Sequence, residues 1–287
     1  MGDLVSATVL VAVAATMALW VRRLIRSPET RADYAATVRA LRWWMIPGAI
    51  AQVTLVATTF WAVMTVAPVT RFGWWSAVGG SGNIAFGQTG RDGLGWTLTA
   101  VAIPAILVLL IPVFAHNEER MFREGAETWS RGRRIRTPVV FGLAHLMMGI
   151  PIAAGVALAV SGIYYQWVYL HAVRPRRPEI DALYAQSRSA TEAPPPEEPC
   201  PPLPVGAPYD AGEWDRVQAL RAEVRARNWQ HRRDREDGVD EDLRRLWTQR
   251  AAVRAPAVRT AAAAHTASNW LLCGVLAVLV TIDLVIA

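Results

Sequence analysis

Long runs of apolar side chains limit the folds that are open to this chain. Residues 4–21 are almost wholly apolar and about 18 in number, enough for a helix that crosses a hydrocarbon core of about 30 Å. Comparable runs occupy residues 43–67, 96–115 and 260–285. Inside a bilayer the backbone must satisfy its own hydrogen bonds, so each run is expected to form a spanning helix. The sequence therefore predicts an all-α, polytopic transmembrane helical bundle.

The apolar stretch at residues 137–170 needs a separate interpretation. Its 34 residues are too many for one upright span and too few for two complete ones. The tripeptide Gly-Ile-Pro at 149–151 lies near its middle, and a proline cannot continue a helix without the loss of a hydrogen bond. We therefore expect two short or bent spans, 137–150 and 152–170, joined by a tight bend, which brings the total to about six spans.

Arginines indicate how the spans are oriented, since the chain has no lysine. The connections at 22–42 and 116–136 hold six arginines each, and the one at 68–95 holds two. Cytoplasmic loops are enriched in basic residues, so the first two connections are expected on the cytoplasmic side and the N-terminus outside. Asp3 precedes the first apolar run and arginines follow it, which favours a retained span over a cleaved signal peptide. A Gly-rich stretch at 79–90 lacks the flanking strand and helix of a dinucleotide site, so we expect a flexible loop there.

Residues 171–258 differ from the rest of the chain. After a Pro-rich stretch that we expect to be extended, apolar side chains recur at helical spacing between charged ones. Asp237-Gly238 offers a turn, which predicts an amphipathic helical hairpin. Fifteen arginines balance fifteen acidic residues here, so the net charge of +6 belongs to the membrane part. No basic patch is interleaved with aromatic residues, which argues against nucleic acid as a partner and favours a solvated helix pair that docks on the membrane core or on a protein.

Ionisable and polar side chains inside or against the spans are candidates for function, because they are costly there. They form three groups, each of which contains a pair with helical i,i+4 spacing. The pairs are Glu119 with Arg123, next to Glu118; Phe141 with His145; and His265 with Asn269. A carboxylate and an imidazole together can take a proton from water, and a second imidazole with an amide can stabilise an oxyanion. These are the parts of a hydrolase that uses water directly, without a Ser or Cys nucleophile.

Other interpretations of these groups stay open at this point. The carboxylates at 118–119 could be interfacial charges, His145 could be a packing residue, and His265 with Asn269 could join helices. His145 and His265 could also be the axial ligands of a b-type haem. A third possibility is a non-catalytic scaffold or immunity protein that acts through residues 171–258.

Taken in order, the three groups resemble the motifs of a known family. EERMFR at 118–123, FGLAH at 141–145 and HTASN at 265–269 resemble the E-E-x-x-x-R, F-x-x-x-H and H-x-x-x-N motifs of the CAAX-protease and bacteriocin-processing (CPBP) family of intramembrane endopeptidases. The resemblance covers about 96–170 and 259–287. The insertion between the second and third motifs has no counterpart in the compact core of that family.

The resemblance implies a role for each residue. Glu118 and His145 would activate the attacking water, while His265 and Asn269 would stabilise the oxyanion. The supporting side chains would be Glu119, Arg123 and Phe141. A metal-free site is favoured; zinc held by Glu118, His145 and His265 stays possible, although no H-E-x-x-H motif occurs.

The spans also bear on whether one site can form. If residues 137–170 cross the membrane twice, all three motifs lie in the cytoplasmic leaflet. If they cross it once, Glu118 and His265 are separated by most of the hydrocarbon thickness of about 30 Å. We therefore expect two crossings. The chain is then expected to have four parts: residues 1–95 with two spans and an outer loop, 96–170 with the first part of the core, 171–258 as a cytoplasmic insertion, and 259–287 with the last span. The absence of lysine is typical of a GC-rich bacterial source. The predicted function is hydrolysis of a membrane-associated or lipid-modified peptide at the inner (cytoplasmic) membrane.

Overall fold

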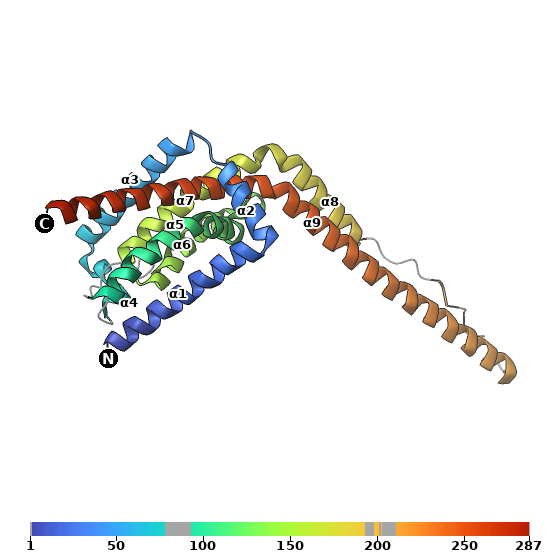
Figure 1. Ribbon diagram of the computed structural model, residues 1–287. Coiled ribbons are helices and arrows are strands. Elements are labelled where there is room, and N and C mark those ends of the chain that lie inside the picture. The colour runs from blue at the N-terminus through green and yellow to red at the C-terminus, as the bar shows by residue number, and fades with distance from the viewer. Residues whose placement is uncertain (1, 78–92, 193–197, 201, 203–210, 287) are drawn as a thin grey trace. The chain divides into compact units, whose positions relative to one another are not determined.

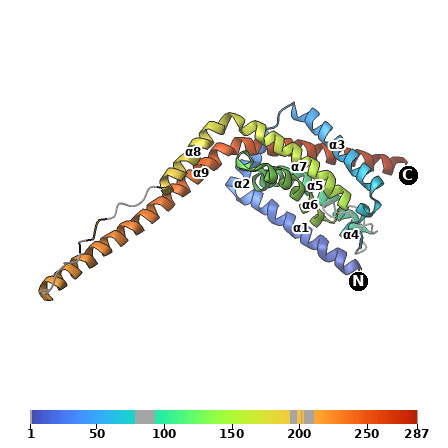
Figure 2. The same ribbon diagram turned by 180° about the vertical axis from the view of Figure 1, so that it is seen from behind.

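The chain forms helices throughout the computed structural model (Figures 1 and 2). The structure describes residues 2–77, 93–192, 198–200, 202 and 211–286. Within these ranges no strand occurs, which confirms the all-α prediction. The α-helices are α1 Gly2–Arg26, α2 Pro28–Arg39, α3 Met45–Val66, α4 Trp74–Ala77, α5 Leu94–Arg123, α6 Arg131–Ala144, α7 Ile152–Val173, α8 Arg177–Glu192 and α9 Ala211–Ile286. The predicted loop at 79–90 and most of the Pro-rich stretch lie outside the described residues.

Five helical segments in the described ranges are long and apolar enough to cross a membrane. They are Ala7–Arg26, Met45–Val66, Leu94–Thr128, Ile152–Ser189 and Trp214–Val278. Helix α6 covers part of the predicted span at 137–150 but has only 14 residues, a rise of about 21 Å. The predicted bent pair therefore consists of one short helix and one full span, α7, within a polytopic helical bundle.

Contacts divide the chain into two compact units. The first, which we call the membrane unit, comprises Met1–Pro175 and Arg254–Ala287; the second, the charged unit, comprises Arg176–Val253. In the membrane unit, α6 and α3 both pack against α7, and α2 packs against α5. Large apolar side chains such as Trp61 on α3 and Val101 on α5 are exposed on its surface, as expected for faces that contact lipid.

The bend predicted at 149–151 joins α6 to α7. Gly149 adopts a φ of +76°, a left-handed conformation that glycine takes without steric cost. The two helices then run back along each other so closely that a Cβ atom at Gly142 would lie 2.2 Å from the carbonyl oxygen of Gly155. Small residues permit this approach between membrane helices. The hairpin therefore depends on glycine at both the bend and the crossing.

Two prolines inside helices free carbonyl groups that side chains of neighbouring helices then bind. Pro112 in α5 cannot donate to the carbonyl of Val108, and the indole N–H of Trp270 on α9 donates to that oxygen at 3.0 Å. Pro138 in α6 likewise frees the carbonyl of Arg134, which accepts from the side-chain amide of Gln166 on α7 at 3.0 Å. These contacts fix α9 against α5 and α7 against α6 and satisfy backbone groups where water is scarce.

Replacement of Trp270 by Phe is expected to lower the free energy of unfolding by about 1–2 kcal/mol, because the Val108 carbonyl loses its partner. The same replacement should cost less in a Pro112→Ala background, where the backbone N–H of the introduced alanine restores the bond within the helix. Unfolding of the four proteins in mixed micelles measures this double-mutant cycle. An equal cost in both backgrounds would contradict the assignment.

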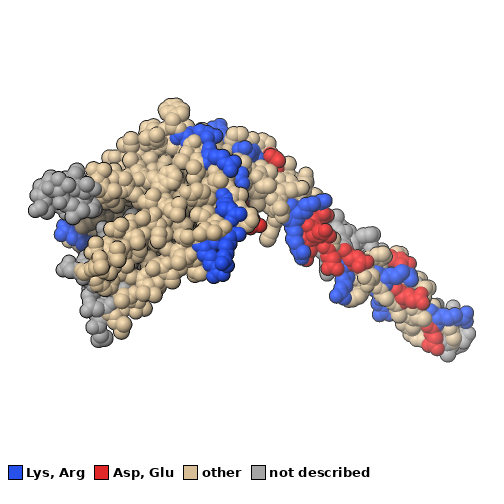
Figure 3. Space-filling model, in the orientation of Figure 1, with Lys and Arg blue, Asp and Glu red and all other residues tan. Residues whose placement is uncertain are grey.

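The charged unit consists of α8 and the first part of α9, which lie side by side (Figures 1 and 2). The predicted hairpin with a turn at Asp237-Gly238 is wrong, because α9 continues through both residues. One glycine costs a helix only about 1 kcal/mol, which strong helix formers on either side can offset. Within the unit the guanidinium of Arg250 lies 4.4 Å from the ring centre of Tyr184 on α8. Figure 3 shows basic and acidic side chains intermixed on this unit.

An exposed ion pair in the charged unit gives a pH-dependent contact. Arg227 donates two hydrogen bonds to the carboxylate of Glu198, at 3.0 and 3.2 Å, and this holds the pKa of Glu198 below its ordinary value of 4.5. Because the folded-state pKa is the lower one, the contact is stabilising above pH 4.5 and is lost as the pH falls through the lowered value. The backbone N–H of Glu198 donates to Asn228 at 2.9 Å.

We expect the hydrogen-exchange protection factor of the Glu198 amide to fall on acidification through this range. The ion pair and Asn228, which also donates to the Glu198 carbonyl at 2.8 Å, hold the same residue, so protonation of the carboxylate should weaken the hold on the amide. The Glu198→Gln variant, which cannot titrate at this position, should show low protection at every pH. A protection factor in the wild type that does not change with pH would contradict this prediction.

Candidate active site

The first predicted group lies at the C-terminal end of α5. Glu119 and Arg123 are fully buried, at 0% and 1% exposure, and the Nη1 atom of Arg123 donates to the Oε1 atom of Glu119 at 3.2 Å. This is the ion pair that the i,i+4 spacing predicts. The side chain of Glu118 is 24% exposed. Of the two adjacent carboxylates, Glu118 is thus the one that a ligand can reach.

Helix α9 brings the third predicted group to the same place. The ring of His265 is buried, with its Nδ1 atom 3.0 Å from the Oε1 atom of Glu119 and its Nε2 atom 3.8 Å from the Oε2 atom of Glu118. A carboxylate can only accept, so the Nδ1 atom carries the proton in the shorter contact. Both nitrogens of one imidazole therefore face the two carboxylates of α5.

Aromatic rings connect the second group to the first and third. The Phe141 ring lies 4.0 Å from the Arg123 guanidinium carbon, and its centre lies 4.6 Å from that of His145 and 5.9 Å from that of His265. Tyr165 on α7 stacks on His265 with ring centres 4.1 Å apart. Phe141 is thus the residue through which the three groups meet, and guanidinium contact with an aromatic face is itself favourable.

His145 and Asn269 are less tightly integrated than the resemblance implies. The Nδ1 atom of His145 lies 2.8 Å from the carbonyl oxygen of Phe141, and among the described residues His145 forms no ion pair with Glu118 or Glu119. Glu118 is paired with His265 instead. Asn269 is half-buried one turn beyond His265, and its side chain makes no hydrogen bond within the described ranges.

Several side chains at the site carry no signal in the sequence. Tyr165 lies within an apolar run, yet its ring stacks on His265. Glu127, just beyond α5, binds Arg254 at 2.6 Å and accepts from the hydroxyl of Tyr169 at 2.9 Å. The one sequence property that could have indicated these residues is that each is a polar residue in or near a span, which is not specific enough to identify them. The Glu127 contacts tie the end of α5 to α7 and α9 and so hold the site in position.

Some buried polar atoms of this cluster have no hydrogen-bond partner. They include the Oε2 atoms of Glu118 and Glu119 and an Nη2 atom of Arg123. A buried polar atom left unpaired costs about 1–3 kcal/mol, so these atoms favour a polar ligand such as water. Carboxylates beside an imidazole are groups that can take a proton from that water.

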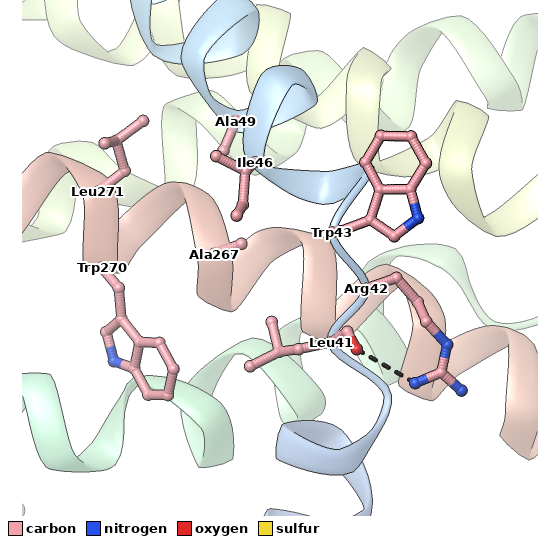
Figure 4. A pocket seen from close by; sticks show the side chains of 8 residues that line it. All are labelled: Leu41, Arg42, Trp43, Ile46, Ala49, Ala267, Trp270 and Leu271. Atoms are coloured by element: carbon pink, nitrogen blue, oxygen red, sulfur yellow. Dashed lines mark hydrogen bonds between the residues drawn. The ribbon is translucent and has the colours of Figure 1, made fainter.

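An apolar cavity of about 440 Å³ lies beside the turn of α9 that carries Asn269. Ala267, Trp270 and Leu271 form one side of it. Figure 4 shows the side chains of Ile46 and Ala49 from α3 on the other side. The cavity is large enough for an apolar side chain or part of a lipid chain.

Among the described residues, no three His, Cys, Asp or Glu side chains are arranged to share a metal ion. No protein-family model, curated protein or solved structure matches the chain. The function is accordingly argued from the geometry of the site.

Proposed function

We propose that the protein is an intramembrane endopeptidase that hydrolyses a membrane-associated or lipid-modified peptide with a water activated by Glu118. One observation carries this proposal: His265 contacts Glu118 and Glu119, although 146 residues separate it from Glu119. Structural ion pairs alone do not require a partly open carboxylate beside a buried imidazole. A hydrolase does, because the substrate and water must reach the base.

The contacts support a division of labour among the side chains. Glu118 accepts the proton of the attacking water, and Glu119 with Arg123 holds His265 in position beside it. The carbonyl of Phe141 can only accept, so the Nδ1 atom of His145 donates to it, and the Nε2 atom is the ring nitrogen left to accept a proton from water. His145 can therefore assist Glu118 as a second acceptor. The amide of Asn269, which has no other partner among the described residues, is left to donate to the oxyanion.

The surroundings of the site support a peptide held in the bilayer as substrate. The apolar cavity is lined by Ala267, Trp270 and Leu271 on the same stretch of α9, although not by Asn269 itself, and it suits an apolar side chain or an attached lipid. The arginine-rich connections favour a site in the cytoplasmic leaflet of a bacterial inner membrane. The balance of basic and acidic residues over 171–258 favours a protein partner over nucleic acid there.

Cleavage of membrane peptides by the purified chain in proteoliposomes tests the proposal. Mass spectrometry should detect new termini with the wild type, and Glu118→Gln and His145→Ala should abolish them. Cleavage that persists undiminished in both variants would refute it. A cellular effect that is indifferent to Glu118 would favour the scaffold or immunity interpretation.

Among the described residues, the contacts of His145 and His265 give the haem interpretation no support. Phe141 packs edge-on against both imidazole rings, and both nitrogens of His265 face carboxylates. A Soret band in the purified protein would nevertheless identify a haem directly.

A further inference from the structure

A second, smaller cavity lies in the membrane unit between α1, α2 and α5. Its volume is about 80 Å³, and most of the side chains around it are polar. The charged and polar residues that line it include Arg23, Glu29, Asp33, His116, Asn117 and Arg120. Two carboxylates face two guanidinium groups there, so the cavity has no excess charge that would select an ion. Such a cavity suits a neutral polar ligand.

His116 is the deepest polar group of this cavity. It is only 6% exposed, its Nε2 atom lies 3.6 Å from Asp33, and its Nδ1 atom is buried without a hydrogen-bond partner. An unpaired buried nitrogen is unfavourable, and a polar cavity of this size can hold more than one water molecule. Water at the cavity would supply the missing partner.

Unpartnered buried atoms continue from His116 toward Glu118. His116 lies within electrostatic range of Glu119, one turn further along α5, and of Arg259 on α9. The Nε atom of Arg259 and the Oε2 atoms of Glu119 and Glu118 are all buried without a hydrogen-bond partner. These unsatisfied donors and acceptors lie on α5 and α9, the helices that carry His116 of the small cavity, the proposed base and His265.

The opposite side of the cavity is open to polar surroundings. Arg23, Glu29 and Arg120 line it and are exposed, whereas His116 is buried. Charged side chains at the end of a span are expected in the aqueous headgroup region. The cavity thus reaches from the water-exposed end of the bundle to a buried imidazole.

We propose that this cavity is filled with water and is the route by which water reaches Glu118. The inference rests on the proposed hydrolytic function for its purpose, but the hydration of the cavity can be tested without any substrate. An intramembrane hydrolase needs such a route, because the lipid around its spans excludes water.

Silver ion tests the hydration, because it reaches a thiol only through water. The background is a chain that carries Cys200→Ser and Cys273→Ser. His116→Cys is made in this background, and Ala115→Cys is its matched control. Ala115 is the preceding residue of α5, is 1% exposed and does not line the cavity. Silver bound to the introduced thiol prevents its later alkylation. This protection should develop about tenfold faster in the His116→Cys variant than in the Ala115→Cys variant, because only position 116 lines the water-filled cavity. Equal rates would overturn the proposal.

Filling the cavity tests the supply of water to the reaction. Thr30 lines the cavity, and both its backbone N–H and its hydroxyl donate to the Oγ atom of Ser27 at the start of α2, each at 3.1 Å. Phe and Val at this position both lack the hydroxyl bond, so the two variants differ in how far they fill the cavity. Thr30→Phe should lower cleavage about tenfold, whereas Thr30→Val, which keeps the shape of threonine, should stay within about twofold of wild type. Equal rates for the two folded variants would overturn the water route.

The outcomes separate this inference from the proposed function. If the wild type cleaves no peptide, the hydrolytic function fails, while the silver rates still decide whether the cavity is hydrated. If cleavage depends on Glu118 but Thr30→Phe has no effect, the function stands and the water route fails. If Thr30→Phe does not fold, the silver comparison at His116 and Ala115 decides alone.

Discussion

Replacement of Glu118 by Gln is expected to lower the rate of peptide cleavage by about 10²–10⁴-fold, the usual effect of losing a general base. The amide keeps the shape of the side chain but cannot take a proton from water. Glu118 is the partly exposed carboxylate of the cluster, with its Oε2 atom 3.8 Å from the Nε2 atom of His265. Initial rates in proteoliposomes measure the effect, and melting temperatures verify that the variant is folded.

Glu124→Gln is the matched control for this substitution. Glu124 follows the end of α5, is similarly exposed at 23%, and pairs with Arg120 at 3.7 Å, away from His265. Because an exposed pair of this kind contributes little, the control should cleave within about twofold of wild type. An equal loss in both variants would mean that the charge of the region matters and that Glu118 has no special role.

Helical spacing is the property that the sequence predicted well at this site. The i,i+4 rule places Glu119 against Arg123 and Phe141 against His145, and both contacts are present. Long apolar runs and the proline at 151 likewise predicted the spans and the bend at Gly149. These are local properties, which depend on residues a few positions apart.

Contacts between distant segments could not be predicted in the same way. The sequence indicates that Pro112 frees a carbonyl, but nothing in it identifies Trp270 as the donor. The stacking of Tyr165 on His265 and the pairing of Glu118 with His265 depend on how the helices pack. The turn expected at Asp237-Gly238 failed because the local preference of a glycine is weaker than the helical preference around it.

Replacement of Arg123 by Met is expected to lower the free energy of unfolding by about 3–5 kcal/mol, the usual effect of removing one partner of a buried ion pair. Arg123 is 1% exposed, donates to Glu119 at 3.2 Å and covers the ring of Phe141. Met retains much of the packing volume, so the loss reports mainly the uncompensated Glu119 carboxylate. Reversible unfolding of the full chain in mixed micelles measures it.

Arg120→Met provides the comparison on the same helix. Arg120 and Glu124 have the same i,i+4 spacing, but Arg120 is 59% exposed, so its loss should cost no more than about 1 kcal/mol. The contrast tests burial as the cause, since sequence spacing and helix are shared. Equal costs for the two variants would contradict it.

The Glu119→Gln and Arg123→Met double variant separates stability from activity. Each single change leaves a charge without its partner, whereas the double change removes both, so its cost should be smaller than the sum of the two by about 0.5–3 kcal/mol. Glu119 also holds the Nδ1 atom of His265 at 3.0 Å, and an amide that can rotate holds that ring less firmly. We therefore expect the double variant to recover stability but not cleavage. Recovery of both would mean that the stack of Tyr165 on His265 suffices to position the imidazole, and that the buried pair serves the fold alone.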